Sequence, residues 1–312
     1  MFSSADSHIP TRSTTLVVTR PSHQAFVLDR ALRAGRRDVV TSIPPATWDG
    51  RSNGWLPAAA HKELVVDGAL LPVVQEHNIE LLRHAEGVHV FDTEGGPTDP
   101  FAEPIAPPWA AAKRVIDIAG AAVLLLVTLP IIVAAMVAIR VSSPGPTLFR
   151  QERVGKRGRR FTLLKVRTMV PDNDDSEHER YVAALIDGTA PRCNGMYKLD
   201  NDPRVTPIGR ILRRSSIDEL PQLWNVLRGD MSLVGPRPPL PRETERYDAT
   251  SWARLLGRPG ITGLWQVSGR CERTFGEQVA LDAAYWRQWS LWLDLCILAR
   301  TPLAVLSARG AA

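Results

Sequence analysis

Hydrophobic and polar positions divide the chain into an alternating N-terminal part, one long apolar segment and a C-terminal part of mixed pattern. Over residues 14–92, short apolar runs and amphipathic stretches follow one another in an order that predicts strand, helix, strand, then strand, helix, strand. This order is typical of a small βαβ-like module. Its loops carry no glycine fingerprint for a dinucleotide, so we expect no cofactor there and favour a regulatory or vestigial role over a catalytic one.

The sequence on either side separates this module from its surroundings. Residues 1–13 are expected to be disordered, and residues 93–111 are rich in proline and glycine, which predicts a linker. A membrane segment over residues 112–141 and a larger domain over residues 142–309 make up the rest of the predicted organisation.

The apolar segment Ile118–Ile139 contains no charge in 22 residues and is long enough to cross a bilayer. Pro130 lies near its centre and removes a backbone hydrogen bond, which favours a break, and Thr128 is placed to satisfy the freed carbonyl. Basic residues flank both ends, whereas positive charge normally stays on the cytoplasmic side. A re-entrant hairpin and a spanning helix both fit this pattern, and a buried helix of a soluble core fits it less well.

Beyond this segment the patterns predict strands and helices. We expect a turn, a strand and a turn over 142–155, a strand over 161–170 and a helix over 207–227. Tryptophans recur at three-residue spacing at positions 286, 289 and 292. Tryptophans on one helical face are typical of a membrane interface, and packing against the core is the equally simple alternative.

Composition adds a preference for anionic partners, because the sequence pI is about 9.4 and the net charge is +5. Nucleic acid is not expected among them, since only Phe149 and Phe161 accompany the basic stretch 150–167. The three cysteines are far apart and lack CxxC spacing, which predicts reduced thiols and no zinc site. The N-terminus has no apolar core of signal-peptide type, so membrane contact is expected from the internal segment.

The strongest candidate for chemistry is the adjacent pair Asp218 and Glu219, which follows several basic residues. A carboxylate among arginines stays ionised, and it can attack an electrophilic phosphorus or hold Mg²⁺. A structural alternative exists, because Ser216 and Glu219 fit a capping box and Pro221 suits a first helical turn. In that case the two acids would only begin a helix.

Arginines in rigid turns are the second candidate feature. Arg237 lies between prolines, and glycine-rich turns contain Arg258, Gln266 and Arg270. A guanidinium on a fixed backbone suits bidentate contact with phosphate. Neither a Walker-type loop nor a GxSxG motif is present, so the common nucleotide-triphosphatase and α/β-hydrolase sites are excluded.

Together these motifs resemble the bacterial sugar transferase family, the monotopic phosphoglycosyl transferases. The matching motifs are KRVID (113–117), SSPGPTLFRQERVG (142–155), FTLLKVRTM (161–169), the run from NDPRV to GPRP (201–238) and RPGITGLWQVSGR (258–270). The likeness covers close to two-thirds of the chain. It implies an α+β, membrane-associated fold: a re-entrant helix-break-helix hairpin and a mainly helical cytosolic catalytic domain with a small sheet. The small N-terminal α/β module lies outside the likeness.

The resemblance also implies an activity. Such an enzyme transfers a sugar 1-phosphate from a UDP-sugar to polyprenyl (undecaprenyl) phosphate and releases UMP, as the first membrane step of exopolysaccharide or related glycan assembly. Asp218 would attack the β-phosphate and carry the sugar phosphate covalently, and Glu219 would help hold Mg²⁺. The expected location is the bacterial inner membrane, with the catalytic domain on the cytoplasmic face. Membrane lipids are further expected partners, and a homodimer is a possible assembly.

Other roles are carried over position by position. Residues that match family positions near phosphate or nucleotide, or recurrent family acids, are Arg167, Arg213, Arg237, Arg270, Asp282 and Asp294. Pro130 matches the proline that breaks the family's membrane helix, which favours the re-entrant alternative. Leu129 stands where the family often has serine, and the N-terminal part lacks the four spanning helices of larger members. A catalytically silent membrane adaptor is the second hypothesis, and the intact Asp218–Glu219 pair argues against it.

Overall fold

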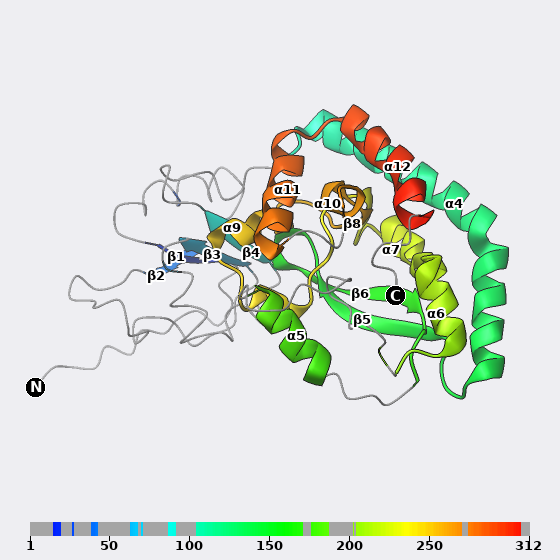
Figure 1. The fold of residues 1–312 in the computed structure, drawn as a ribbon. Coiled ribbons are helices and arrows are strands. Elements are labelled where there is room, and N and C mark those ends of the chain that lie inside the picture. Colours follow the sequence, from blue (N-terminus) through cyan, green and yellow to red (C-terminus); the bar gives the residue numbers. More distant parts are fainter. Residues whose placement is uncertain are drawn as a thin grey trace, which may run out of the picture. The chain divides into compact units, whose positions relative to one another are not determined.

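The computed structural model divides the chain into two compact units, Met1–Ala102 and Glu103–Ala312 (Figure 1). The structure describes, in the first unit, residues 15–19, 27, 39–42, 63–67, 70 and 87–91. In the second unit it describes residues 104–170, 176–186, 202, 204–269 and 274–306.

The described part of the first unit is a four-stranded parallel sheet in the order β2-β1-β3-β4. Its strands are β1 (Thr15–Val18), β2 (Val39–Ser42), β3 (Glu63–Asp67) and β4 (Gly87–Phe91). Successive residues of β1 and β3 are buried, as expected for a parallel sheet covered on both faces. The strands lie where the alternating pattern predicts them, and the helices predicted between them fall, apart from Val27, outside the described residues.

The second unit combines helices with two small sheets. Its helices are α4 (Pro107–Ser142), α5 (Ser176–Ile186), α6 (Pro207–Arg214), α7 (Gln222–Arg228), α8 (Pro241–Thr244), α9 (Ala249–Trp252), α10 (Leu264–Val267), α11 (Phe275–Arg287) and α12 (Leu291–Leu306). The 3₁₀ turns are η3 (Lys156–Gly158), η4 (Ile217–Glu219) and η5 (Ala253–Leu255). Strands β5 (Leu148–Val154) and β6 (Arg160–Val166) pair antiparallel, and β7 (Ser232–Val234) pairs parallel with β8 (Gly260–Thr262).

The two strands predicted after the apolar segment are confirmed by the hairpin β5–β6. The single helix predicted over 207–227 is wrong. Helix α6 ends at Arg214, Ser216 adopts a left-handed backbone with φ of 55°, and the turn η4 separates α6 from α7. The pattern of apolar positions was helical on both sides of this break and gave no sign of it.

The tryptophans near the C-terminus do not share one helical face, because α11 ends before α12 begins at Leu291. Trp286 is buried in the core, and the Trp289 indole N–H donates to Asp294 Oδ2 at 3.2 Å. Trp292 is 74% exposed. Two of the three therefore serve packing, and one lies on the surface.

Helix α4 is continuous through Pro130, although proline cannot donate a backbone hydrogen bond to the carbonyl of Leu126. The Thr128 hydroxyl does not satisfy that carbonyl as expected, since it donates to the Leu124 carbonyl at 2.7 Å. The structure thus has one long helix where the sequence predicts a helix-break-helix hairpin. Figure 1 shows that this helix curves along the unit, first beside α12 and then beside α6.

Both ends of α4 pack on the same unit. Near its start, Ala110 packs against the main core, and Ala121, closer to the middle, is buried in that core with residues of α7 and β7. Near its end, Ala135 and Ile139 pack against Val166 of β6 and Leu212 of α6. The burial pattern contains a gap between these anchors, because no residue from 122 to 131 is buried.

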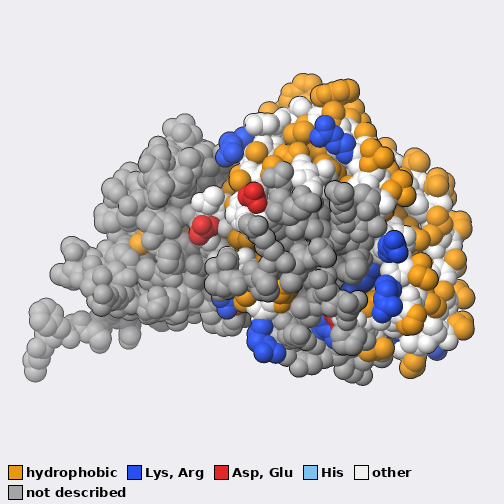
Figure 2. Space-filling model, viewed as in Figure 1, with side chains coloured by type: hydrophobic (Ala, Val, Ile, Leu, Met, Phe, Trp, Pro, Cys, Tyr) orange, Lys and Arg blue, Asp and Glu red, His pale blue; other side chains and the backbone are white. Residues whose placement is uncertain are grey.

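The gap coincides with an apolar outer surface. Helix α4 is the one described helix long and apolar enough to cross a membrane, and only 17% of its most apolar stretch is buried. Figure 2 shows hydrophobic side chains gathered where Figure 1 places α4 and α12. Exposed residues of this surface include Val123, Leu126, Val127, Val133, Val137, Trp292 and Leu303. An exposed apolar patch of this extent marks a membrane or protein contact.

A buried ion pair joins α4 to α12. Lys113 Nζ donates to Asp294 Oδ2 at 2.6 Å and to the Val234 carbonyl of β7 at 3.1 Å. Asp294 also accepts from the Tyr285 hydroxyl at 2.7 Å. Because every buried charge here has several partners, the network can offset the cost of removing two ions from water.

Removing one partner of this pair should destabilise the protein strongly. We expect Asp294→Leu to lower the free energy of unfolding by about 3–5 kcal/mol, because Lys113 would remain as an uncompensated buried cation. Denaturant unfolding of the full chain in detergent measures this. Adding Lys113→Met to the variant should restore part of the loss.

The matched control is Arg228→Ala, since Arg228 pairs with Asp230 at the surface at 3.6 Å. Its expected effect is below about 0.5 kcal/mol. If both substitutions lowered the free energy of unfolding equally, burial of the Lys113–Asp294 pair would not account for the loss.

Candidate active site

Asp218 and Glu219 occupy the turn η4 between α6 and α7. The capping box predicted at Ser216 is wrong, because its side chain makes no cap hydrogen bond and its backbone is left-handed. A non-glycine residue with this φ costs about 1–3 kcal/mol, and such strain concentrates at functional sites. The structure therefore favours a positioned carboxylate pair over a simple helix start. A capping box does occur in this chain, at Thr274 and Glu277 of α11.

Cations surround this pair. Lys165 of β6 contacts Glu219, with Nζ 2.8 Å from Oε1, and Asp218 is buried. Arg213 of α6 donates to the Thr168 hydroxyl at 2.9 Å, which fixes its guanidinium beside the acids. Burial lowers the pKa of Arg213, and the charges of Asp218 and Asp202 oppose that shift.

Two further arginines share one carboxylate. Arg237 Nη1 lies 3.2 Å and Arg153 Nη1 3.9 Å from oxygens of Glu243, whose side chain is buried. Arg153 is held by Gln151 and by the Pro238 carbonyl. Burial, together with the nearby charge of Arg237, lowers the pKa of Arg153 to about 9. A bound anion would relieve this crowding of positive charge.

The charge of Glu219 partly opposes the lowering of the Arg153 pKa, which is consistent with the two groups lying near each other. The strand β6, the turn η4, helix α6 and the GPRP segment after β7 thus converge on a region with two adjacent acids and several fixed cations. Such a region suits a substrate with negative oxygens around an electrophilic centre, because the cations reduce the repulsion of an attacking carboxylate.

Three predicted site residues donate hydrogen bonds to backbone carbonyls of the protein rather than pointing to the two acids. Arg167 donates to the Ser143 and Pro144 carbonyls at the end of α4, with distances of 3.0 and 2.7 Å. Arg258 Nε donates to the Gly229 carbonyl at 2.8 Å, and Gln266 Nε2 donates to the Ile261 carbonyl at 3.2 Å. In this structure they support the framework, and substrate contact by them stays a prediction.

Two predicted acids are also framework residues here. Asp282 pairs with Arg254 at 2.7 Å, and both side chains are fully buried. Asp294 belongs to the Lys113 network described above. Arg270 lies outside the described residues.

Sequence reasoning missed Lys165, Arg153 and Glu243 as individual site residues. For the first two the sequence offered only an ambiguous signal, because each is one of two cations in its strand: β5 contains Arg150 and Arg153, and β6 contains Arg160 and Lys165. Glu243 carried no signal, since its burial depends on how α8 packs on β5.

Comparison with known proteins places this site in a family. The profile described as "Bacterial sugar transferase" matches residues 109–308, so the chain belongs to the bacterial sugar transferase family. The matched range holds α4 from Trp109 onward and every site residue described above. The N-terminal unit lies outside it.

Curated relatives agree with this class. The chain is 45% identical over 201 residues to "Galactosyl transferase CpsE" of Streptococcus agalactiae, covering 64% of this chain and 43% of that protein. It is 40% identical over 206 residues to "Exopolysaccharide production protein ExoY" of Rhizobium meliloti, covering 66% of this chain and 90% of that protein. A third, "UDP-glucose:undecaprenyl-phosphate glucose-1-phosphate transferase" of Caulobacter vibrioides, is 44% identical over 207 residues, with coverages of 64% and 71%. The chain thus spans less than half of the first of these proteins and most of the second.

The buried pair at Asp282 generates a pH prediction. Burial raises the pKa of Asp282 from 3.8 to about 6, against the opposing charge of Arg254. The Asp282 carboxyl therefore binds its proton more tightly in the folded protein than in the unfolded chain. Protonation of Asp282 contributes fully to the free energy of unfolding below pH 3.8, and this contribution is lost as the pH rises through 6.

We therefore expect the melting temperature of the wild type, relative to Asp282→Asn, to fall between about pH 4 and about pH 6 and to level off above about pH 7. Thermal unfolding of both proteins across this range measures the difference. An advantage of the wild type that grows with pH would show that pairing with Arg254 outweighs burial.

Proposed function

We propose that this protein transfers a sugar 1-phosphate from a UDP-sugar to polyprenyl phosphate and releases UMP, as a membrane step of exopolysaccharide assembly. The single observation that carries the proposal is the grouping of Asp218 and Glu219 with Lys165 and Arg213, in a unit whose long helix exposes an apolar surface. The printed names of the relatives, which include glucose 1-phosphate transfer to undecaprenyl phosphate, support the same reaction.

In the proposed reaction, a carboxylate oxygen of Asp218 attacks the phosphorus that carries the sugar. The bond from this phosphorus to the bridging oxygen breaks, and that oxygen leaves with UMP. A phosphate oxygen of the polyprenyl acceptor then attacks the same phosphorus and releases Asp218 as the free carboxylate. Arg213, Lys165 and Arg237 hold the negative oxygens of both substrates, which lowers the repulsion in each attack.

Magnesium is part of the proposal. Mg²⁺ is usually held by one or two carboxylates and substrate phosphates, and the adjacent acids of η4 fit that pattern. Glu219, which is partly exposed beside Lys165, would hold the ion. When bound, Mg²⁺ would draw charge from the diphosphate oxygens.

The proposal also covers how α4 is arranged relative to the membrane. Lys113, near the start of α4, and Ile139, near its end, both pack in the unit that contains Asp218, so a bilayer cannot lie between them. We therefore propose that α4 enters the inner membrane from the cytoplasmic face and leaves by the same face. The reaction site would then lie near the headgroups, where a lipid phosphate is found.

Asp218→Asn should abolish UMP release from UDP-glucose and UDP-galactose, with a loss of about 10⁴-fold or more, because the attacking group is removed. The assay uses purified full chain with Mg²⁺ and polyprenyl phosphate. Intact-mass analysis after donor alone should show a hexose phosphate on the wild type and none on the variant.

Glu152→Gln is the matched control, since this exposed acid pairs with Arg160 at the surface of the hairpin. It should keep near-normal activity. UMP release by Asp218→Asn at the control's rate would refute the covalent route, and no release by the folded wild type from any UDP-sugar would favour a silent adaptor.

A labelling experiment tests the topology. In a cysteine-free background, Ala111→Cys and Ser143→Cys place one thiol at each end of α4. A membrane-impermeant maleimide should label both in inside-out vesicles and neither in right-side-out vesicles. Labelling of the two positions from opposite sides would establish a spanning helix instead.

A further inference from the structure

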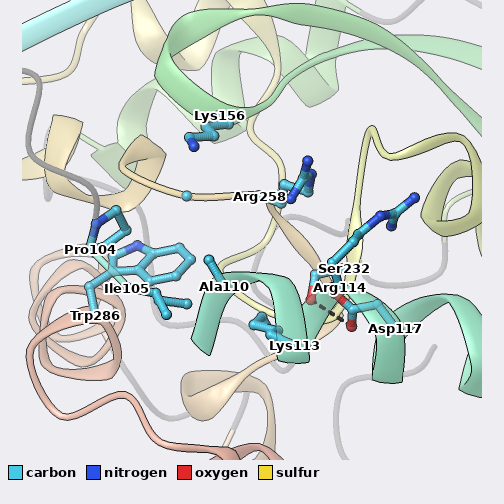
Figure 3. Close-up of a pocket in the computed structure, with 11 residues that line it drawn as sticks. Pro104, Ile105, Ala110, Lys113, Arg114, Asp117, Lys156, Ser232, Arg258 and Trp286 are labelled. Atoms are coloured by element: carbon cyan, nitrogen blue, oxygen red, sulfur yellow. Dashed lines mark hydrogen bonds between the residues drawn. The ribbon is translucent and has the colours of Figure 1, made fainter. Parts of the chain in front are cut away.

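Two cavities meet at the start of α4. The first, which we call the basic cavity, is an open hollow of about 410 Å³, a volume that includes solvent space, and its lining includes Arg114, Lys156 and Arg258. In Figure 3 the side chains of Arg114 and Arg258 lie together on one side of it, and Lys156 lies on another. The second, the apolar cavity, is an open hollow of about 450 Å³, solvent space included, between α4 and α12. Lys113 and Asp117 line both, so the two cavities share one wall.

The basic cavity has an excess of positive charge. Its acid, Asp117, is turned toward β7, where it accepts from the Ser232 hydroxyl and the Leu233 N–H at 2.9 Å each. Arg114 donates to the Val226 and Leu227 carbonyls at the end of α7. Burial and then the charge of Arg258 lower the pKa of Arg114. An anion in this cavity would relieve that repulsion.

The apolar cavity opens toward the exposed apolar surface formed by α4 and α12. Leu291, Leu295 and Leu298 of α12 face Ile116 of α4 across it. Leu295 and Ile116 are also exposed, so they continue the apolar surface of α4 and α12. A chain of methylene groups suits a cavity lined in this way.

The position of the shared wall relates both cavities to the bilayer. Val115 and Ile118, next to the wall on α4, are exposed, and Trp292 is exposed on α12. Apolar side chains enter the hydrocarbon, whereas lysines and arginines at the adjoining helix end lie among the headgroups. The apolar cavity therefore opens at hydrocarbon depth and the basic cavity at headgroup depth.

We propose that the two cavities together bind one acidic phospholipid, with its phosphate in the basic cavity and an acyl chain in the apolar cavity. This site is separate from the reaction site, because Asp218 and Glu219 line neither cavity. They precede α7, whereas Arg114 binds carbonyls at the far end of that helix. The inference rests on the membrane attachment proposed above, not on the transfer reaction.

Native mass spectrometry of the full chain tests this site. The protein is released from nanodiscs that contain equal amounts of phosphatidylglycerol and phosphatidylcholine. We expect one phosphatidylglycerol to stay bound in preference to phosphatidylcholine. Lys156→Gln and Arg258→Gln should each lower its retention about 5-fold, the expected effect of removing one cation near an anionic lipid. The matched control is Arg242→Gln, because Arg242 is exposed on α8 and lines neither cavity.

A second variant tests the acyl-chain half. Leu295→Trp places a larger side chain in the apolar cavity and should lower retention of both lipids, with folding checked by circular dichroism.

Excess glycerol 3-phosphate should not displace the bound lipid, and displacement would identify a soluble phosphate ligand instead. Equal retention of the two lipids, or retention unchanged in all the cavity variants, would overturn the proposal. UMP release is measured in parallel: its absence with lipid retained would count against the transfer reaction and leave the lipid site standing.

Discussion

The salt bridge between Lys113 and Asp294 is the constraint on which the arrangement of the second unit depends. Two ions this deeply buried must be matched to each other and to other polar groups, or folding would lose several kcal/mol. Lys113 meets this demand through the Val234 carbonyl, and Asp294 meets it through Tyr285. One ion pair therefore fixes α4, β7 and α12 in a single register. Because the GPRP segment follows β7 directly, the same register also sets where that segment, and with it Arg237, begins.

The reaction site follows a complementary electrostatic logic. Its acids lie on a short turn that the left-handed Ser216 directs, and its cations come from elements that are far apart in the sequence. Each cation is fixed by a hydrogen bond or a shared carboxylate before any substrate binds. A site prepared in this way loses little entropy when it binds a diphosphate, and its crowded positive charge is relieved by binding.

Much of this could be predicted from the sequence, and the limits have physical causes. Strands β5 and β6 and the long apolar helix follow from local periodicity, and the acids of η4 stand out among their basic neighbours. The break at Ser216 could not be predicted, because a left-handed serine is selected by its surroundings and not by local propensity. The roles of Arg167 and Asp282 were equally hidden, since a charged residue looks the same in sequence whether it meets a ligand or a buried partner. The helix through Pro130 shows that tertiary anchors at both ends can keep a proline-containing segment helical.

Anchoring α4 at both ends makes its length a stricter requirement than its composition. One inserted residue would advance the helix by about 1.5 Å and turn everything after it by about 100°. Ile139 would then face away from Leu212 while Lys113 still faced Asp294. Exchanges among aliphatic residues in the exposed middle leave both contacts in phase. Evolution of this segment should therefore permit frequent replacement of one apolar residue by another, but almost no insertion or deletion, because only a change of length moves the two anchored ends out of register.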